Sequence, residues 1–302
     1  MKKQVLITGG TGFVGRHLTQ LLIDNGYNVS VLSRSKKENK PSISYYVWDI
    51  KEQFIDEEAV IKADYIIHLA GENIAGSRWT AERKKNIIDS RVTPISLINS
   101  VLKKHNKKLD AFISASGVGI YGAITDAKIC KENTAAEDDF LGITCQNWEA
   151  AADTIASSTN RIVKVRTGLV LGKNGGFLKK MLPIFKWGLG SPLGSGKQYM
   201  PWIHIDDLCG IYLLALKKEE MNGAYNATIQ DSTTNKEFSK TLTMIVGYKM
   251  WFPAVPAFIL RLVLGEMAVI VLEGRRVSSS KIEKQGFRFK YINLETAIRS
   301  CL

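Results

Sequence analysis

The sequence predicts an α/β protein: a doubly wound parallel sheet with a smaller, mostly helical C-terminal lobe. Three observations predict this fold class. Short apolar runs alternate with helical patterns through the first two-thirds of the 302 residues. The glycine-rich segment VLITGGTGFVG places three glycines between the end of the first apolar run and the start of the first helical pattern. The alternation ends after Gly172, and from Asn235 onward short helical patterns are separated by Gly and Pro. Strands that alternate with helices form parallel sheets covered on both faces.

Six strands are predicted in order along the first part of the chain. They are the apolar runs QVLIT, NVSVLS, ISYYVW, ADYIIHLAG, LDAFISASG and RIVKVRTG. Helical spacing of apolar residues predicts helices over residues 13–26, 80–104 and 136–157. Farther on, KNGGFLKKMLPIFKWGLG predicts a helix followed by glycines, and MPWIHIDDLCGIYLLAL predicts a strand and then a helix.

These elements suggest two structural parts. We expect residues 1–172 plus about 201–230 to form the sheet domain, and about 173–200 and 231–302 to form the lobe. The lobe is expected over the carboxyl edge of the sheet, where ligands bind in open α/β sheets.

Composition and cysteine usage narrow the functional class. With 45% hydrophobic and 23% charged residues, the chain is expected to be globular rather than disordered. Its four cysteines are widely scattered, so we expect neither a metal site nor a disulfide framework, in keeping with a cytoplasmic protein. No apolar signal segment follows the first residues.

One stretch, Pro253 to Leu272, resembles a membrane segment in composition. Arg261 and Glu266 interrupt it, and each would cost about 2.5–3.5 kcal/mol at a bilayer centre. We therefore predict two short helices over a hydrophobic pocket and no membrane partner.

The net charge of +12 comes mostly as lysine pairs without interleaved aromatics. This pattern indicates solvated surfaces rather than a nucleic-acid site, although it favours an anionic ligand.

The glycine-rich segment predicts a nucleotide site of the Rossmann type. Gly9 permits a tight turn, Gly12 lets the backbone approach a pyrophosphate, and Gly15 lets the helix pack on the strand. The second strand ends in VLSRSKK, where an NAD site would have Asp or Glu. Ser33, Arg34 and Lys36 instead offer donors and positive charge, which suits the 2′-phosphate of NADP(H), and the alternative is a solvated basic turn.

These motifs resemble the extended branch of the short-chain dehydrogenase/reductase superfamily. Further marks are WDI, HLAG, IYG and PWIHIDDL. More narrowly, HLAGENIAGSRWT, SRVTP, SASGVGIYG, NWEAAA, GSGKQYMPWIHIDDL and LVLGEMAVIVLEGRRV are similar to an atypical epimerase-family, or nucleoside-diphosphate-sugar-epimerase-like, subfamily.

The resemblance implies a set of cofactor contacts. Arg91 stands where extended members have Asn, and it could reach a cofactor phosphate or be an exposed helix residue. Asn86 would share that stretch. The implied contacts are Gly9, Thr11, Gly12, Phe13, Val14, Gly15, Ser33, Arg34, Asp49, Leu69, Ala70, Gly71, Asn86 and Arg91. The segment SRVTPISLINSVL could help build the helix-pair homodimer common in the superfamily.

Active members of the superfamily use a Tyr as proton donor or acceptor, with a Lys four residues later that lowers the Tyr pKa. None of the ten tyrosines in this chain has Lys four residues later. In FLGITCQNWEAAAD, where that pair is expected, the corresponding pairs are Leu141/Cys145, Ile143/Asn147 and Cys145/Glu149.

Other groups are therefore considered for catalysis. Ser116 and Tyr121 are the predicted catalytic residues, and Ser114 is an alternative to Ser116. Cys145 is more typical of a buried apolar site, and Glu149 of a carboxylate paired with a nearby Arg or Lys.

Three interpretations follow. The first is an NADP(H)-dependent oxidoreductase or epimerase-like enzyme acting on a small carbonyl or sugar-type substrate. The second is a non-catalytic NADP(H)-binding sensor or regulator. The third, a nucleic-acid-binding module, rests on charge alone, and we expect no nucleic-acid partner.

Overall fold

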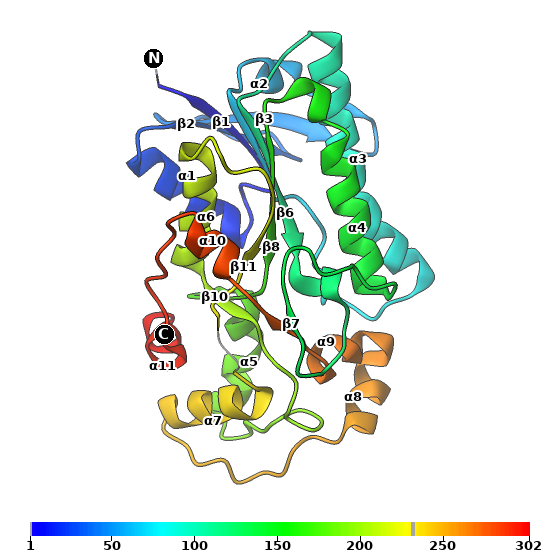
Figure 1. The fold of residues 1–302 in the computed structure, drawn as a ribbon, viewed down its shortest axis with the longest axis vertical. Coiled ribbons are helices and arrows are strands. Elements are labelled where there is room, and N and C mark those ends of the chain that lie inside the picture. The colour runs from blue at the N-terminus through cyan, green and yellow to red at the C-terminus, as the bar shows by residue number, and fades with distance from the viewer. Residues whose placement is uncertain (1, 231–232) are drawn as a thin grey trace.

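A mostly parallel sheet of eight strands runs through the middle of the molecule (Figure 1). The computed structural model describes residues 2–230 and 233–302. The strand order is β11-β8-β6-β5-β1-β2-β3-β4, and all neighbours are parallel except β3 and β4. The strands are β1 (Gln4–Thr8), β2 (Asn28–Ser33), β3 (Ile43–Asp49), β4 (Phe54–Ile55), β5 (Tyr65–His68), β6 (Ala111–Gly117), β8 (Ile162–Thr167) and β11 (Gly223–Ala227).

Helices cover both faces of this sheet. α1 (Phe13–Asp24) and α6 (Ile205–Lys217) lie on one face, and α3 (Ala81–Lys104) and α4 (Phe140–Asp153) on the other (Figure 1). The short α2 (Glu57–Ile61) packs on α3. Each face has its own apolar core, because residues of one strand point alternately to the two sides. The doubly wound sheet predicted from the sequence is confirmed.

The six predicted strands all form, and the long helices differ from prediction mainly at their ends. α3 begins after Thr80, whose side chain accepts a hydrogen bond from the Arg83 backbone N–H. α4 begins four residues later than predicted, because Asp139 caps it by accepting from Gly142 N at 2.8 Å. The two-residue strands β4, β7 (Ile129–Cys130) and β12 (Arg276–Val277) are too short to give a periodic signal.

A smaller, mostly helical part lies below the carboxyl edge of the sheet in Figure 1. Its core contains Phe185, Trp202 and Phe238. The parallel pair β9 (Leu169–Gly172) and β10 (Trp202–His204) joins it to the sheet. Its helices are α5 (Gly176–Lys186), α7 (Asn235–Ile245), α8 (Ala257–Leu264), α9 (Val269–Leu272) and α11 (Leu294–Ser300), and the 3-10 turn Gly265–Ala268 links α8 to α9.

The C-terminal segment returns to the sheet. β12 pairs with β7, and Ile282 of α10 (Ser280–Lys284) packs in the same core as α1 and α6. Asp207 of α6 accepts hydrogen bonds from Lys290 N and Tyr291 N, at 2.8 and 3.0 Å. The predicted boundaries between sheet domain and lobe stay a prediction, and residues 231 and 232 at one of them lie outside the described residues.

The predicted membrane-like stretch forms α8, the 3-10 turn and α9. Within residues 2–230 and 233–302, no helix is long and apolar enough to cross a membrane. The same residues contain no group of His, Cys, Asp and Glu arranged to hold a metal ion. The four cysteines are buried and free.

Candidate functional site

The glycine-rich turn between β1 and α1 is shaped by close backbone approach. Gly9 has φ +69°, and a Cβ there would lie 2.9 Å from the carbonyl carbon of Leu69. A Cβ on Gly15 would lie 2.3 Å from the Gly9 carbonyl oxygen. Both positions therefore require glycine for the turn and the packing.

Gly12 is less crowded than these two glycines. It is exposed at the N-cap of α1, and of the described atoms only the Gly9 oxygen, at 3.1 Å, would touch an added Cβ. No described side chain caps α1. Its first N–H groups are thus presented to a ligand from a glycine-lined surface, which fits the pyrophosphate of a dinucleotide.

The rest of this loop is held by contacts at its two sides. Thr11 is exposed, and its carbonyl oxygen accepts a hydrogen bond from Arg16 Nη1 at 2.6 Å. Phe13 and Val14 are half-buried and pack against the core beneath α6.

The carboxyl ends of β2 and β3 carry the residues expected at the adenosine end. Ser33 is buried, whereas Arg34 next to it is exposed and available to an anion. Asp49 is exposed, and its Oδ1 accepts from the backbone N–H groups of Lys51 and Glu52 at 2.9 and 3.2 Å. Asp49 therefore shapes the turn after β3.

Thr8 ties the ends of β1 and β5 together beneath the glycine-rich turn. Its Oγ1 lies 2.8 Å from His68 Nδ1 and accepts from Leu69 N and Ala70 N, both at 3.2 Å. These bonds fix the backbone of Leu69 and Ala70, for which the family resemblance implies a cofactor contact. Neither Thr8 nor His68 was among the predicted contacts, although Thr8 directly precedes Gly9.

Arg91 is buried rather than exposed on its helix. Its guanidinium donates to the carbonyl oxygens of Ile87 and Glu72 at 2.7 and 3.0 Å and lies 4.9 Å from the Trp148 ring centre. Burial lowers its pKa. A Cβ on Gly71 would come within 3.2 Å of Arg91 Cγ, so the arginine underlies the end of the β5 loop. Asn86, by contrast, is exposed.

A buried polar network joins β6, α4 and β8. Ser116 Oγ donates to Glu149 Oε1 at 2.7 Å. Glu149 is held by two hydrogen bonds from Arg166, of 2.8 and 2.9 Å. Burial alone would lower the Arg166 pKa, but the bonds and attraction of Glu149 raise it. The expectation that Glu149 pairs with an arginine or lysine is confirmed.

Tyr121 belongs to the same network and is fully buried. Its hydroxyl donates to Asn226 Oδ1 at 2.7 Å and accepts from Arg166 Nη1 at 2.9 Å. Burial raises the pKa of Tyr121 to about 12. This is the opposite of the lowered pKa that a catalytic tyrosine needs near neutral pH.

Cys145 and Leu141, two of the residues at the expected Tyr and Lys positions of α4, lie in apolar surroundings. Burial raises the pKa of Cys145 to about 12, so its thiol stays neutral, and the expectation of a buried apolar site is confirmed. Leu141, one turn earlier, packs in a cluster with Trp79, Phe140 and Met267. Ser114 donates to the neighbouring Ala115 carbonyl oxygen at 2.9 Å.

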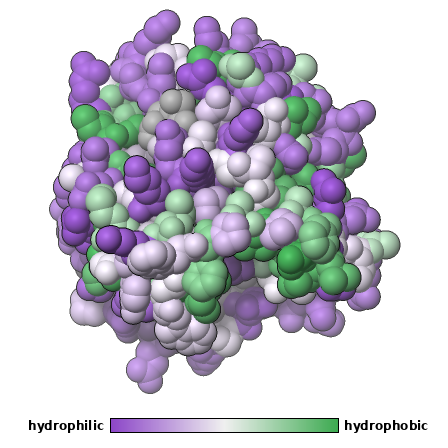
Figure 2. Space-filling model, turned by 90° about the horizontal axis from the view of Figure 1, so that it is seen from below, coloured by the Kyte–Doolittle hydropathy of each residue, from purple (hydrophilic) through white to green (hydrophobic). Residues whose placement is uncertain are grey.

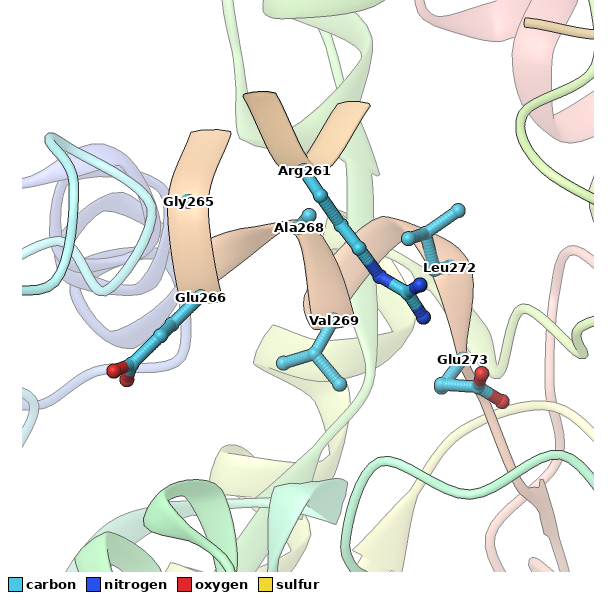
Figure 3. Close-up of a pocket in the computed structure, with 7 residues that line it drawn as sticks. All are labelled: Arg261, Gly265, Glu266, Ala268, Val269, Leu272 and Glu273. Atoms are coloured by element: carbon cyan, nitrogen blue, oxygen red, sulfur yellow. The ribbon is translucent and has the colours of Figure 1, made fainter. Parts of the chain in front are cut away.

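A cavity of about 290 Å³ lies in the lobe between α8 and α9. In Figure 3, Arg261 extends between Val269 and Leu272, whereas Glu266 points away. The seven lining residues are Arg261, Gly265, Glu266, Ala268, Val269, Leu272 and Glu273. The sequence predicts that residues 194–205 and 255–272 together form an apolar pocket at the nicotinamide end of the cofactor, and this stays a prediction. The two segments touch, because Gln198 Nε2 donates to the Val271 carbonyl oxygen at 2.6 Å. Segment 194–205 itself does not line this cavity.

Comparison with known proteins agrees with this geometry. Residues 5–228 match the NAD dependent epimerase/dehydratase family. The chain belongs to this family. Residues 255–301 match a domain of unknown function, DUF1731. Membership of the atypical epimerase-family branch of the extended short-chain dehydrogenases, expected from the motifs, is confirmed.

Relatives align along nearly the whole chain. The epimerase family protein YfhF of Bacillus subtilis is 34% identical over 97% of this chain and 96% of its own length. The human epimerase family protein SDR39U1 has been solved with NADPH, and matches with a TM-score of 0.86 at 33% identity over 99% and 98% of the two chains. A UDP-glucose 4-epimerase from Thermotoga maritima shares the fold, with a TM-score of 0.78 at 20% identity over 98% of both chains.

Proposed function

We propose that this protein is an NADP(H)-binding oxidoreductase or epimerase-like enzyme that acts on a small carbonyl or sugar-type substrate without a Tyr-Lys pair. The observation that carries the proposal is the uncapped N-terminus of α1 behind Gly12, with the exposed Arg34 at the end of the next strand. The solved human relative, whose crystal structure contains NADPH, supports this choice of cofactor.

The chain's own residues would hold the dinucleotide along the carboxyl edge of the sheet. The first N–H groups of α1 would face the pyrophosphate, and Ser33 and Arg34 the 2′-phosphate. Leu69 and Ala70, fixed by Thr8, would line the cofactor. When bound, NADPH supplies a hydride.

Among the predicted catalytic residues, Ser116 keeps its place in the proposal and Tyr121 does not. The bond between Ser116 and Glu149 orients the Ser116 hydroxyl, and the Arg166 pair fixes Glu149 in turn. We assign Ser116 the polar contact to a substrate carbonyl, and to make it the Ser116 hydroxyl would turn its single hydrogen from Glu149 Oε1 to the carbonyl oxygen. Tyr121 is assigned a structural role, because Arg166 and Asn226 enclose its hydroxyl.

The cofactor assignment is tested by titrating NADPH and NADH by calorimetry. NADPH should bind more tightly than NADH. Arg34→Ala should weaken the affinity for NADPH roughly 10- to 100-fold and barely change the affinity for NADH, since a charge-assisted bond contributes about 1.5–3 kcal/mol. Arg288→Ala, which removes another exposed arginine, should leave both affinities unchanged. Equal affinities for the two dinucleotides in the wild type would refute the assignment.

The catalytic assignment is tested with a panel of carbonyl and nucleotide-sugar substrates. Turnover should be slow, because loss of general acid catalysis costs ~10²–10⁴ in rate. Ser116→Ala should reduce it further, whereas Tyr121→Phe and Cys145→Ala should change stability more than rate. Turnover that is insensitive to Ser116→Ala would place the chemistry elsewhere. Tight NADPH binding without turnover of any substrate would favour the alternative function of a non-catalytic NADP(H)-binding sensor or regulator.

A further inference from the structure

Helix α8 turns its most apolar face to the solvent. Phe258 and Leu262, four residues apart, are 70% and 74% exposed, and Ile259 and Val263 beside them are 39% and 57% exposed. These four side chains form one stripe, because positions i and i+4 share a helix face. Among the described residues of α8, none is buried.

The helix is held rigidly in this orientation. Arg78 donates to the carbonyl oxygens of Val263 and Leu262, at 2.7 and 2.5 Å, and so satisfies the C-terminal end of α8. Just beyond, Met267 packs beside Trp79 in a buried cluster. The outward stripe is therefore a feature of the folded chain.

Two loops extend the apolar stripe across the underside of the lobe. Trp251 and Phe252 are 77% and 50% exposed, and Trp187 and Leu189 are 76% and 51% exposed. The loops are joined near residues 192–194, where Val255 N donates to Pro192 O and Gly194 N to Val255 O, at 2.8 and 2.9 Å. Figure 2 views the molecule from this side, and hydrophobic groups stand out at the right, over α8. The lower apolar face comprises Trp187, Leu189, Trp251, Phe252, Phe258, Ile259, Leu262 and Val263.

The charges nearest the lower apolar face are mostly positive. From Lys173 to Met200 the sequence contains five lysines and no Asp or Glu. From Phe238 to Gly265 it contains two lysines, one arginine and no acidic residue. Lys186 and Lys249, next to the exposed aromatics, are themselves exposed. Glu266, which follows α8, is paired with Lys84.

We propose that the lower apolar face docks onto an anionic lipid bilayer surface. A short amphiphilic helix with neighbouring tryptophans and lysines can lie in the interface plane, with apolar groups among the acyl chains and cations at the headgroups. A second copy of this chain would bring the same positive charge against it, which is unfavourable. The proposal departs from the sequence-based expectation of no membrane partner.

The test is co-sedimentation of the full-length protein with vesicles of phosphatidylcholine, with and without phosphatidylglycerol. We expect binding to the anionic vesicles that weakens as salt is added. Leu262→Asp should weaken vesicle binding about tenfold or more, since burial of an apolar side chain contributes about 1.5–3 kcal/mol. Lys186→Gln and Lys249→Gln should each weaken it about fivefold.

Matched controls lie at the opposite end of the molecule. Phe54→Asp removes an apolar side chain that is 52% exposed on β4, and Lys108→Gln removes an exposed lysine beyond α3. Both should bind vesicles like the wild type. For each variant, an NADPH affinity and a thermal unfolding curve like those of the wild type verify that it is folded. If Leu262→Asp does not fold, Trp251→Ser takes its place in the test.

Three outcomes would overturn the proposal. The first is that the protein does not bind anionic vesicles. The second is that it binds them equally well after substitutions in α8 and in the loops. The third is that it does not bind vesicles but self-associates, and that Leu262→Asp abolishes this self-association. The last outcome would assign the face to a second copy of the chain.

Discussion

At the residue scale, His68 shows how burial sets the chemistry of a side chain. It is fully buried between the rings of Phe112 and Trp148, each with its centre 6.4 Å away. Its Nδ1 bonds with Thr8, but its Nε2 has no partner among the described residues. Burial lowers the pKa of His68 to about 3, so the imidazole is neutral at physiological pH.

This histidine predicts a loss of stability in mild acid. The unfolded chain takes up a proton below the ordinary pKa of 6.5, whereas folded His68 does so only near 3. The free energy of unfolding therefore falls as pH falls through this window, by up to about 1.4 kcal/mol per pH unit. Between about pH 7 and about pH 5, urea unfolding should show the wild type losing about 2 kcal/mol more than His68→Asn. The exposed His17→Asn variant should behave like the wild type, and an unchanged slope in His68→Asn would contradict this account.

At the element scale, α4 forms where the sequence predicts a helix and contains neither Tyr nor Lys. Asp139 caps it, which the sequence did not predict, and Trp148, Ala151 and Ala152 pack together against the sheet. Glu149 on the same helix is neutralised by Arg166. The helix now contributes packing and one buried carboxylate.

Helix α1 gives a prediction that separates folding from binding. Gly15→Ala would force a Cβ to within 2.3 Å of backbone oxygen, and it should lower the stability by about 1–3 kcal/mol or more. Gly12→Ala meets the protein at 3.1 Å only, yet it stands where the pyrophosphate would approach. It should lower the melting temperature less than Gly15→Ala does, because only the Gly9 oxygen has to shift slightly, and it should weaken NADPH binding roughly tenfold or more. Thermal unfolding measures the effect of each variant on stability, and calorimetric titration measures its effect on NADPH binding. If Gly12→Ala binds NADPH as tightly as the wild type, the proposed pyrophosphate site is refuted.

At the scale of the whole molecule, the start of α5 contacts the nucleotide loop. A Cβ on Gly172 or Gly175 would lie 2.7 or 2.0 Å from the ring of Phe13, which stands in the first turn of α1. Segments about 160 residues apart thus meet beside the pyrophosphate position. The dimer expected through residues 90–102 stays a prediction.

This contact predicts an indirect effect on cofactor binding. Gly175→Ala should displace the Phe13 ring and weaken NADPH about tenfold, although residue 175 itself is not a proposed cofactor contact. In a Phe13→Ala background, the same substitution should have little further effect. Equal, additive losses in both backgrounds, measured by titration, would show that the two residues act independently.

The sequence by itself determined the sheet, its main helices and the glycine-rich loop. Those features are local: strand and helix periods and the spacing of Gly9, Gly12 and Gly15 require no knowledge of distant contacts. Only the tertiary structure paired Glu149 with Arg166, enclosed Tyr121 beside Asn226, and buried Arg91.

It also decided that the stripe on α8 faces outward. An apolar pattern shows which residues share a face, but whether that face is covered depends on where distant segments pack.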